Sequence, residues 1–355
     1  MDSFSHPEFA SHERVLFIAD EQTRLRAIIA IHSTQRGPAI GGCRMWPYQS
    51  QEAALSDALR LSRGMTYKNA LAGIDSGGGK SVIIGNPVID KTQALLKAMG
   101  KAINDLGGLY IAAEDSGTSP NDMSIMAEST PFVAGLDHAN GSGDPSPSTA
   151  HGVYLSICEA VHFRLGKAGV GGLRVHVQGL GKVGFALAEM LAASGAIVVG
   201  SDIKPENCRI AERELSIETT SNDSLFNQAC DVFAPCAMGG VLNQQSIPNL
   251  RTSIVAGAAN NQLLTQHDHV LLHEAGILYC PDYLINAGGV IEVYRRRHGD
   301  SADAIAKSIG EIAPRLRSIL EEANQRAAPP EKIARERADT ILRSDRQNRS
   351  EPWAA

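Results

Sequence analysis

The chain has 355 residues, of which 43% are hydrophobic and 20% charged, with a net charge of -6, values ordinary for a globular protein of two domains and without the basic excess typical of duplex-binding proteins. It contains no apolar stretch long enough for a membrane span, its first residues do not follow a signal-peptide pattern, and its six cysteines form no C-x-x-C pair. We therefore expect a cytoplasmic protein with reduced thiols, no metal site, and neither a membrane nor a nucleic acid as partner.

The first part of the chain alternates apolar strands with helices. Residues 24–34 are rich in isoleucine and predict a buried strand, and residues 50–73 place apolar side chains at helical spacing. Residues 80–85 predict a short strand, and residues 90–108 predict a helix that two glycines stop. A strand at 109–114 then runs into a loop. This pattern predicts an α/β domain at residues 1–140.

A composition shift marks the next boundary. Residues 140–152, "NGSGDPSPSTAHG", are dense in Gly, Ser, Pro and Asn, as expected between domains. The second domain is predicted at residues 141–330. A helical, strongly charged segment follows residue 300, and residues 331–355 are predicted to form a tail that returns toward the first domain.

Residues 173–202 have the order of elements that is typical of a nucleotide-binding fold. The strand "LRVHVQ" leads into the glycine turn "GLGKVG", then a helix, then the strand "AIVVGSD". Gly179, Gly181 and Gly184 match G-x-G-x-x-G, and Asp202 follows Gly179 by 23 residues, close to the ~20 expected. The glycines would let the backbone approach a pyrophosphate. Asp202 would bind a ribose 2′-OH and repel a 2′-phosphate, so NAD is predicted rather than NADP.

Three later apolar runs, "DVFAPCA", "SIVAGAA" and "GILYCPDYL", extend the same pattern. Together these runs predict a parallel, doubly wound sheet. The fold class predicted is therefore α/β with two domains: an N-terminal substrate domain and a Rossmann-type NAD domain, followed by a helical C-terminal segment.

The stretch "GGGKS" at residues 77–81 raises a separate question. A phosphate-binding loop would need a glycine where Ile74 stands, so that interpretation fails. We interpret the glycines instead as clearing space around the amine of Lys80.

Eight stretches between residues 37 and 295 resemble the Glu/Leu/Phe/Val amino-acid dehydrogenases, specifically the leucine/valine type. They are "GPAIGGCRMWPY", "LSRGMTYKNALAGIDSGGGKSVIIG", "AAEDSGTSP", "SGDPSPSTAHGV", "VQGLGKVG", "DVFAPCAMGG", "VAGAANNQL" and "GILYCPDYLINAGGVIEV". The resemblance implies reversible oxidative deamination of an L-amino acid to a 2-oxo acid, ammonia and NADH. It also implies a homo-oligomer, whose N-terminal strands could pair across a two-fold axis.

The resemblance also implies roles for individual residues. Lys68 would hold the substrate carboxylate, Lys80 would be the catalytic lysine, and Asp115 would act beside it on the amino group. Gly42 would lie in a glycine turn whose backbone faces the substrate, and Asn260 or Asn261 would lie near the nicotinamide ribose and the substrate. The remaining cofactor contacts implied are Thr149, Lys182, Val183 and Ala237.

The chemistry is consistent with these residue types. A substrate carboxylate needs a fixed cation, and water attack on the imine needs a base. A free lysine is a poor base because its pKa is about 10.4. Burial and a neighbouring cation lower that pKa, and we expect Lys68 to be the cation. Closure of a cleft between the domains would strengthen these interactions.

Four apolar residues would surround the substrate side chain by the same resemblance: Ile40, Ala113, Val290 and Val293. Ile40 offers no partner for a second carboxylate, which disfavours glutamate, and the methyl of Ala113 leaves less room for a ring. We therefore favour leucine, valine and isoleucine, with phenylalanine or tryptophan as the alternative. This sequence departs from the leucine type at Ser116, Asp144, His151, Glu292 and Tyr294.

Two rival functions make different demands on the sequence. A 2-hydroxy-acid dehydrogenase usually employs a His–carboxylate pair, and the paired lysines upstream of the nucleotide fold speak against it. A non-catalytic NAD-binding regulator could keep the glycine turn but would have no reason to retain Lys68, Lys80 and Asp115 together.

Overall fold

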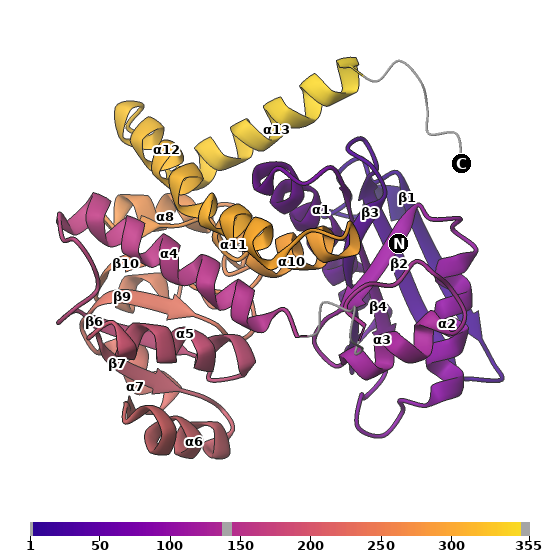
Figure 1. The fold of residues 1–355 in the computed structure, drawn as a ribbon, viewed down its shortest axis with the longest axis horizontal. Coiled ribbons are helices and arrows are strands. Elements are labelled where there is room, and N and C mark those ends of the chain that lie inside the picture. The colour runs from indigo at the N-terminus through magenta and orange to yellow at the C-terminus, as the bar shows by residue number, and fades with distance from the viewer. Residues whose placement is uncertain (1–2, 137–143, 349–355) are drawn as a thin grey trace. The chain divides into compact units, whose positions relative to one another are not determined.

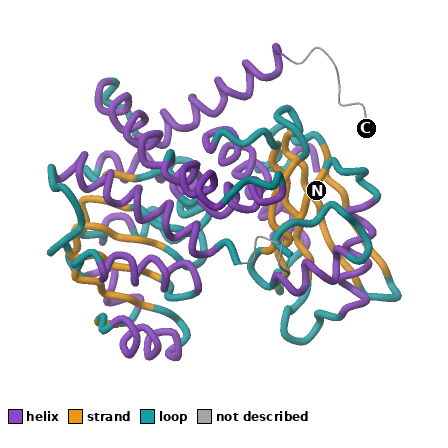
Figure 2. The backbone as a smooth tube through the Cα atoms, viewed as in Figure 1, coloured by secondary structure: helices purple, strands orange, loops and turns teal. Residues whose placement is uncertain are grey.

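The computed structural model describes residues 3–136 and 144–348 (Figure 1). Two compact units can be distinguished along the chain. The first comprises Met1–Asp144, Val293–Asp300 and Ala338–Ala355, and the second comprises Pro145–Glu292 and Ser301–Arg337. Strands gather into two sheets, one in each unit, with helices beside them (Figure 2).

A mixed five-stranded sheet forms the centre of the first unit. Its strands are β1 (Arg14–Asp20), β2 (Leu25–Ser33), β3 (Ala39–Trp46), β4 (Gly77–Ile84) and β5 (Tyr110–Glu114). The order across the sheet is β1-β2-β4-β3-β5. Strand β2 is antiparallel to both β1 and β4, whereas β3 is parallel to both β4 and β5. The strands predicted at 24–34 and 109–114 are confirmed as β2 and β5.

Helices cover both faces of this sheet because each strand alternates its side chains between the faces. Helix α1 (Gln51–Ala72) packs Ala54, Leu55, Ala58 and Leu59 against Ile28, Ala30 and Val82. Helices α2 (Gln93–Asn104) and α3 (Pro120–Ala127) cover the other face, where β2 contributes Ala27, Ile29 and Ile31. Side-chain oxygens of Ser50, Thr92 and Ser119 cap the three helices. The helices predicted at 50–73 and 90–108 are confirmed.

The prediction of a strand from residue 80 is too short at its start. Strand β4 already begins at Gly77, so the glycine run belongs to the strand. Strand β3 was not predicted as a strand at all, because its central glycines read as a turn.

The second unit contains a six-stranded sheet in which every neighbouring pair is parallel. Its strands are β6 (Arg174–Gln178), β7 (Ile197–Ser201), β8 (Glu218–Thr219), β9 (Cys230–Pro235), β10 (Thr252–Val255) and β11 (Leu278–Tyr279). The strand order is β11-β10-β9-β6-β7-β8, so the first strand, β6, lies near the centre of the sheet. Strands β7 and β8 are added on one side of β6, and strands β9 to β11 on the other, as in a doubly wound dinucleotide-binding fold. The predicted Rossmann-type sheet is confirmed.

Six helices accompany the strands of the second unit within the described residues: one precedes β6, four lie between strands, and one directly follows β11. They are α4 (Ser146–Leu165), α5 (Lys182–Ala193), α6 (Pro205–Leu215), α7 (Asn222–Asn227), α8 (Asp268–Glu274) and α9 (Asp282–Ile285). Helix α4 starts inside the boundary predicted at 140–152, of which residues 140–143 lie outside the described residues.

The described part of the chain after residue 300 is helical, as predicted, and one more helix precedes it. These helices are α10 (Gly288–Arg297), α11 (Ala302–Gly310), α12 (Ile312–Gln325) and α13 (Pro330–Asn348). In the described parts of the chain, no helix has the length and apolar character that crossing a membrane requires.

Candidate active site

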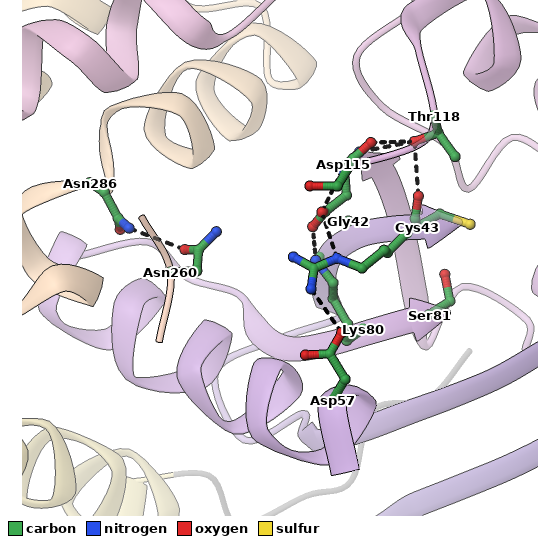
Figure 3. A network of polar contacts seen from close by, with 12 residues as sticks. Gly42, Cys43, Asp57, Lys80, Ser81, Asp115, Thr118, Asn260 and Asn286 are labelled. Atoms are coloured by element: carbon green, nitrogen blue, oxygen red, sulfur yellow. Dashed lines mark hydrogen bonds and ion pairs between the residues drawn. The ribbon is translucent and has the colours of Figure 1, made fainter. Parts of the chain in front are cut away.

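Lys80 and Asp115 meet at one face of the first unit's sheet (Figure 3). Lys80 lies in β4 with 3% of its side chain exposed, and its ammonium contacts Asp115 Oδ2. Asp115 directly follows β5, and the Asp115 amide donates to Thr118 Oγ1 at 3.0 Å. The Thr118 hydroxyl in turn donates to the carbonyl of Cys43 at 2.9 Å. This turn therefore fixes the carboxylate beside the middle of β3.

An arginine that the sequence-based prediction missed completes this cluster. Arg44 Nε donates to Asp115 Oδ1 at 3.1 Å, and Arg44 Nη1 donates to Asp57 Oδ2 in α1 at 2.8 Å. The Tyr48 hydroxyl also donates to Asp57 Oδ2, at 2.6 Å. One feature of the sequence could have pointed to Arg44. This arginine stands in an apolar run two residues after Gly42, and residues at this spacing share a face if the run forms a strand.

The environment of Lys80 favours its neutral form. Burial lowers the pKa of Lys80 well below its ordinary value, and the positive charges of Arg44 and then Lys68 lower it further. The Asp57 carboxylate acts in the opposite direction. Contact with Asp115 also favours the ammonium, but that carboxylate shares its charge with Arg44. Lys68, the cation expected from the sequence, thus lowers the pKa of Lys80, and Arg44 lowers it more.

The glycines before Lys80 do not clear space for a substrate, and that interpretation was wrong. A Cβ on Gly78 would lie 2.1 Å from the Thr66 amide nitrogen in α1, and one on Gly77 would lie 1.9 Å from the Ser33 carbonyl oxygen. A Cβ on Gly79 would lie 2.7 Å from the Tyr110 ring. The run lets α1 and the neighbouring strands approach β4 closely.

Gly42 likewise lies within strand β3, so the predicted glycine turn was wrong. It is the register partner of Ala113 in β5. A Cβ on Gly42 would lie 2.7 Å from both Cβ and Oδ2 of Asp115. Any side chain here would displace the carboxylate that contacts Lys80, which explains why the strand carries glycine.

The other predicted substrate residues occupy several elements. Lys68 is buried in α1, Ile40 is buried in β3, and Ala113 is half-buried in β5. Val290 and Val293 lie in α10, the former half-buried and the latter buried. The two valines belong to different units, since the first unit resumes at Val293.

In the second unit, the three glycines of the G-x-G-x-x-G turn differ in what surrounds them. Gly179 has φ +96°, and a Cβ there would lie 2.8 Å from the Ala237 amide nitrogen. A Cβ on Gly184 would lie 1.8 Å from the Gly179 carbonyl oxygen, whereas one on Gly181 would meet nothing within 4 Å. Gly179 and Gly184 thus serve packing, and Gly181 leaves open space at the start of α5.

The start of α5 fits a pyrophosphate. Gly181 is its N-cap and supplies no side-chain cap, and Lys182 and Val183 are its first two residues. Backbone N–H groups at such a helix start can bind an anion. Asp202 follows β7 and accepts from the Leu180 amide at 2.8 Å, so this carboxylate also anchors the glycine turn.

Further predicted cofactor residues lie in the second unit. The exposed Asn260 accepts from Asn286 Nδ2 at 3.1 Å, and Asn286, which was not predicted, also donates to the Ala258 carbonyl at 3.0 Å. Asn261 has φ +52°, a conformation that asparagine tolerates better than most residues. The Thr149 hydroxyl donates to the Pro145 carbonyl at 3.1 Å. No metal-binding group of three or more His, Cys, Asp or Glu side chains occurs among the residues described.

Comparison with known proteins connects both units to one family. Residues 12–132 match "Glu/Leu/Phe/Val dehydrogenase, dimerisation domain", and residues 202–336 match "Glutamate/Leucine/Phenylalanine/Valine dehydrogenase". The chain is 42% identical to leucine dehydrogenase of Bacillus subtilis strain 168, over 98% of this chain and 97% of that protein. It is 41% identical to phenylalanine dehydrogenase of Caldalkalibacillus thermarum, over 92% of this chain and 90% of that protein.

A solved structure shows the same similarity. The L-tryptophan dehydrogenase of Nostoc punctiforme superposes with a TM-score of 0.77 and 40% identity, covering 94% of this chain and 97% of the other. Relatives named for leucine, phenylalanine and tryptophan are therefore almost equally similar to this chain.

Proposed function

The chain belongs to the Glu/Leu/Phe/Val dehydrogenase family, and from this premise we propose that it performs NAD-dependent, reversible oxidative deamination of an apolar L-amino acid. Membership makes it an oxidoreductase acting on CH–NH2 donors with NAD(P)+. The observation that carries the proposal is the buried contact between Lys80 and Asp115, since a desolvated lysine beside a carboxylate suits proton transfer at an amino group.

In this reaction the three charged site residues of the first unit have distinct roles. The Lys68 ammonium binds the substrate carboxylate as a fixed cation. The Asp115 carboxylate binds the amino group and holds it toward Lys80. Neutral Lys80 takes a proton from the water that adds to the imine, and ammonia then leaves to give the 2-oxo acid. Lys80 needs its lowered pKa for this step, because an ordinary lysine would stay protonated at neutral pH.

We assign the cofactor to the second unit. When bound, NAD would accept the hydride that leaves the substrate Cα. Gly179, Gly181 and the α5 start at Lys182 and Val183 would hold the pyrophosphate, with Gly184 allowing the close packing that places them. Asp202 would accept from the ribose 2′-OH, and its negative charge favours NAD over NADP. The nicotinamide half is assigned to Thr149, Ala237, Asn260 and Asn261.

We propose leucine, valine and isoleucine as the preferred substrates. Ala113 is the register partner of Gly42, which lies against Asp115, and this supports the assignment of its methyl to the substrate side of the proposed amino-group site. Ile40 and Val293 of the same unit are also apolar, as is Val290 of the second unit, so none of these side chains offers a partner for a second carboxylate. An aromatic amino acid is the alternative, because relatives named for phenylalanine and tryptophan are 41% identical to this chain.

A substrate panel tests this assignment. Initial rates of NADH formation should be highest with leucine, valine or isoleucine, low with phenylalanine and tryptophan, and lowest with glutamate. Ala113→Gly should raise the ratio of kcat/KM for phenylalanine to that for leucine by about tenfold, the order of discrimination that one or two methylene-sized groups provide. Faster turnover of phenylalanine or tryptophan by the unaltered enzyme would overturn the substrate assignment and leave the reaction type standing.

We also propose that the protein is a homo-oligomer. The family description matched by residues 12–132 names a dimerisation domain, and β1 is an edge strand of the first unit's sheet. Light scattering after gel filtration should give a mass of at least twice 37.8 kDa. A mass of one chain across micromolar concentrations would contradict this proposal.

A further inference from the structure

A row of alternating charges leads from helix α1 to Lys80. Asp57 binds Arg44 Nη1 at 2.8 Å, Arg44 Nε binds Asp115 Oδ1 at 3.1 Å, and Asp115 Oδ2 contacts the Lys80 ammonium (Figure 3). Tyr48 holds the outer end through its hydrogen bond to Asp57. The row thus connects Asp57 and Tyr48, to which no substrate contact is assigned, to the group proposed as the base.

The row lies where charges act strongly on one another. The side chains of Arg44, Asp115 and Asp57 are 10%, 12% and 24% exposed. Little water is available to screen charges at such sites, so each one changes the protonation of its neighbours more than it would at the surface. The guanidinium of Arg44 is a permanent cation, since arginine is not deprotonated in proteins.

We propose that Arg44 is a positioning residue that fixes Asp115 toward Lys80 and sets the pH at which the Lys80 ammonium gives up its proton, while Asp57 limits this effect. As an account of catalysis, this inference rests on the proposed function. As an account of the Lys80 titration, it stands on the geometry of the row alone.

The two ends of the row act in opposite directions on Lys80. The Arg44 cation lowers the pKa of Lys80 and the Asp57 anion raises it, both after the larger effect of burial. Besides Asp115, which directly follows β5, the other elements around β4 place further residues near Lys80. Strand β2 places the uncharged Ala30 opposite Lys80, β3 adds the Cys43 thiol, and α1 adds the Lys68 cation. Burial raises the pKa of Cys43 to about 11, so that thiol is uncharged at neutral pH.

The test compares two substitutions that remove opposite charges. Arg44→Gln should move the pH at which Lys80 titrates upward by about one pH unit or more, the effect expected of an adjacent charge. Asp57→Asn keeps the side-chain shape and should move it downward. Glu128→Gln, which removes a charge from an ion pair with Lys97 on exposed side chains, is the matched control and should not move it.

Two readouts separate this inference from the proposed function. The first is the pH profile of kcat/KM for oxidative deamination, which reports the pKa values of the acid and base groups in the free enzyme. The second is the carbon-13 shift of lysine Cε in the full-length protein, with the Lys80 signal assigned by its loss in Lys80→Ala. The second readout needs no turnover, so it still tests the role of Arg44 if no amino acid proves to be a substrate.

Opposite shifts in Arg44→Gln and Asp57→Asn would support the proposal. A structural role alone would lower activity without moving the two midpoints apart. Shifts in the same direction, or no shift in Asp57→Asn, would overturn it. Arg44→Gln takes from the part-buried carboxylates of Asp57 and Asp115 the guanidinium that they share, so a variant that does not fold is one outcome to provide for. In that event the double variant Arg44→Gln/Asp57→Asn is compared with Asp57→Asn, and loss of Arg44 must still raise the Lys80 midpoint.

Discussion

Replacing Gly78 with alanine separates two explanations of the glycine run before Lys80. If the glycines make room for a substrate, the variant should fold normally and bind substrate poorly. In the structure the new Cβ would instead lie 2.1 Å from the Thr66 amide nitrogen, 2.2 Å from Thr66 Oγ1 and 2.6 Å from the Ser62 carbonyl oxygen. These atoms belong to the body of α1, so relief requires moving the helix away from β4.

The expected loss of stability is at the high end for overpacking. Inserting a methyl group into a packed core typically costs about 1–3 kcal/mol, and here a backbone nitrogen cannot rotate away. We therefore expect a loss of about 3 kcal/mol or more in the first unit. At ~2–4 °C per kcal/mol for a unit of this size, the melting temperature should fall by roughly 6–12 °C.

Fluorescence of Trp46 in β3 provides the assay. The second tryptophan, Trp353, lies outside the described residues and is replaced by phenylalanine in all samples, so that the signal reports the first unit alone. Gly85→Ala, just past the other end of β4, is the control, because its Cβ would meet the flexible end of Met45 at 3.1 Å. A melting temperature within about 2 °C of the parent for Gly78→Ala, combined with a raised KM, would refute the packing explanation.

Three further outcomes are expected. Gly181→Ala should change the free energy of unfolding by less than about 0.5 kcal/mol yet weaken NAD binding measured by calorimetry. Gly184→Ala should lower the unfolding midpoint, because of these two added Cβ atoms only the one on Gly184 would meet backbone atoms. Equal effects of the two variants on stability would contradict this. Asp202→Asn should raise the kcat/KM ratio of NADP to NAD by about tenfold, because it removes the charge that repels a 2′-phosphate; an unchanged ratio would argue against the ribose role. Burial lowers the pKa of His12 to about 4 and that of His32 to about 3, so both are neutral in the folded protein at neutral pH; the free energy of unfolding should be full above pH ~6.5 and fall as the pH is lowered through about 4 and about 3, which urea titrations should show for the native protein and to a smaller extent for His12→Gln.

The fold of the second unit could be predicted from sequence because its signals are local. The turn "GLGKVG" between two apolar strands determines a parallel β-turn-α-β unit within thirty residues. Strand β8 escaped prediction because two residues carry no periodicity. Strand β3 escaped because Gly41 and Gly42 indicate a turn locally, and only contact with Gly79 and Asp115 in the folded sheet explains them.

The residues of the candidate site could be predicted only in part from the sequence. Lys80 and Asp115 stand in stretches that resemble the family, and the structure brings them into contact. The partnership of Arg44 with Asp57 could not be read from the sequence, because it depends on the packing of α1 beside β3. For the same reason the sequence suggested only Lys68 as the cation near Lys80, although Arg44 has the larger effect.

The central claim is that Lys80 performs proton transfer on an amino acid, and Lys80→Ala tests it most directly. The control is Lys97→Ala, which removes a lysine from a surface ion pair with Glu128. With L-leucine and NAD, the native enzyme and Lys97→Ala should form NADH at similar rates. Lys80→Ala should be slower by at least about 10²-fold, as expected for loss of a general base. Turnover by Lys80→Ala within a few-fold of the native rate, or no turnover of any L-amino acid by the native enzyme, would contradict the account.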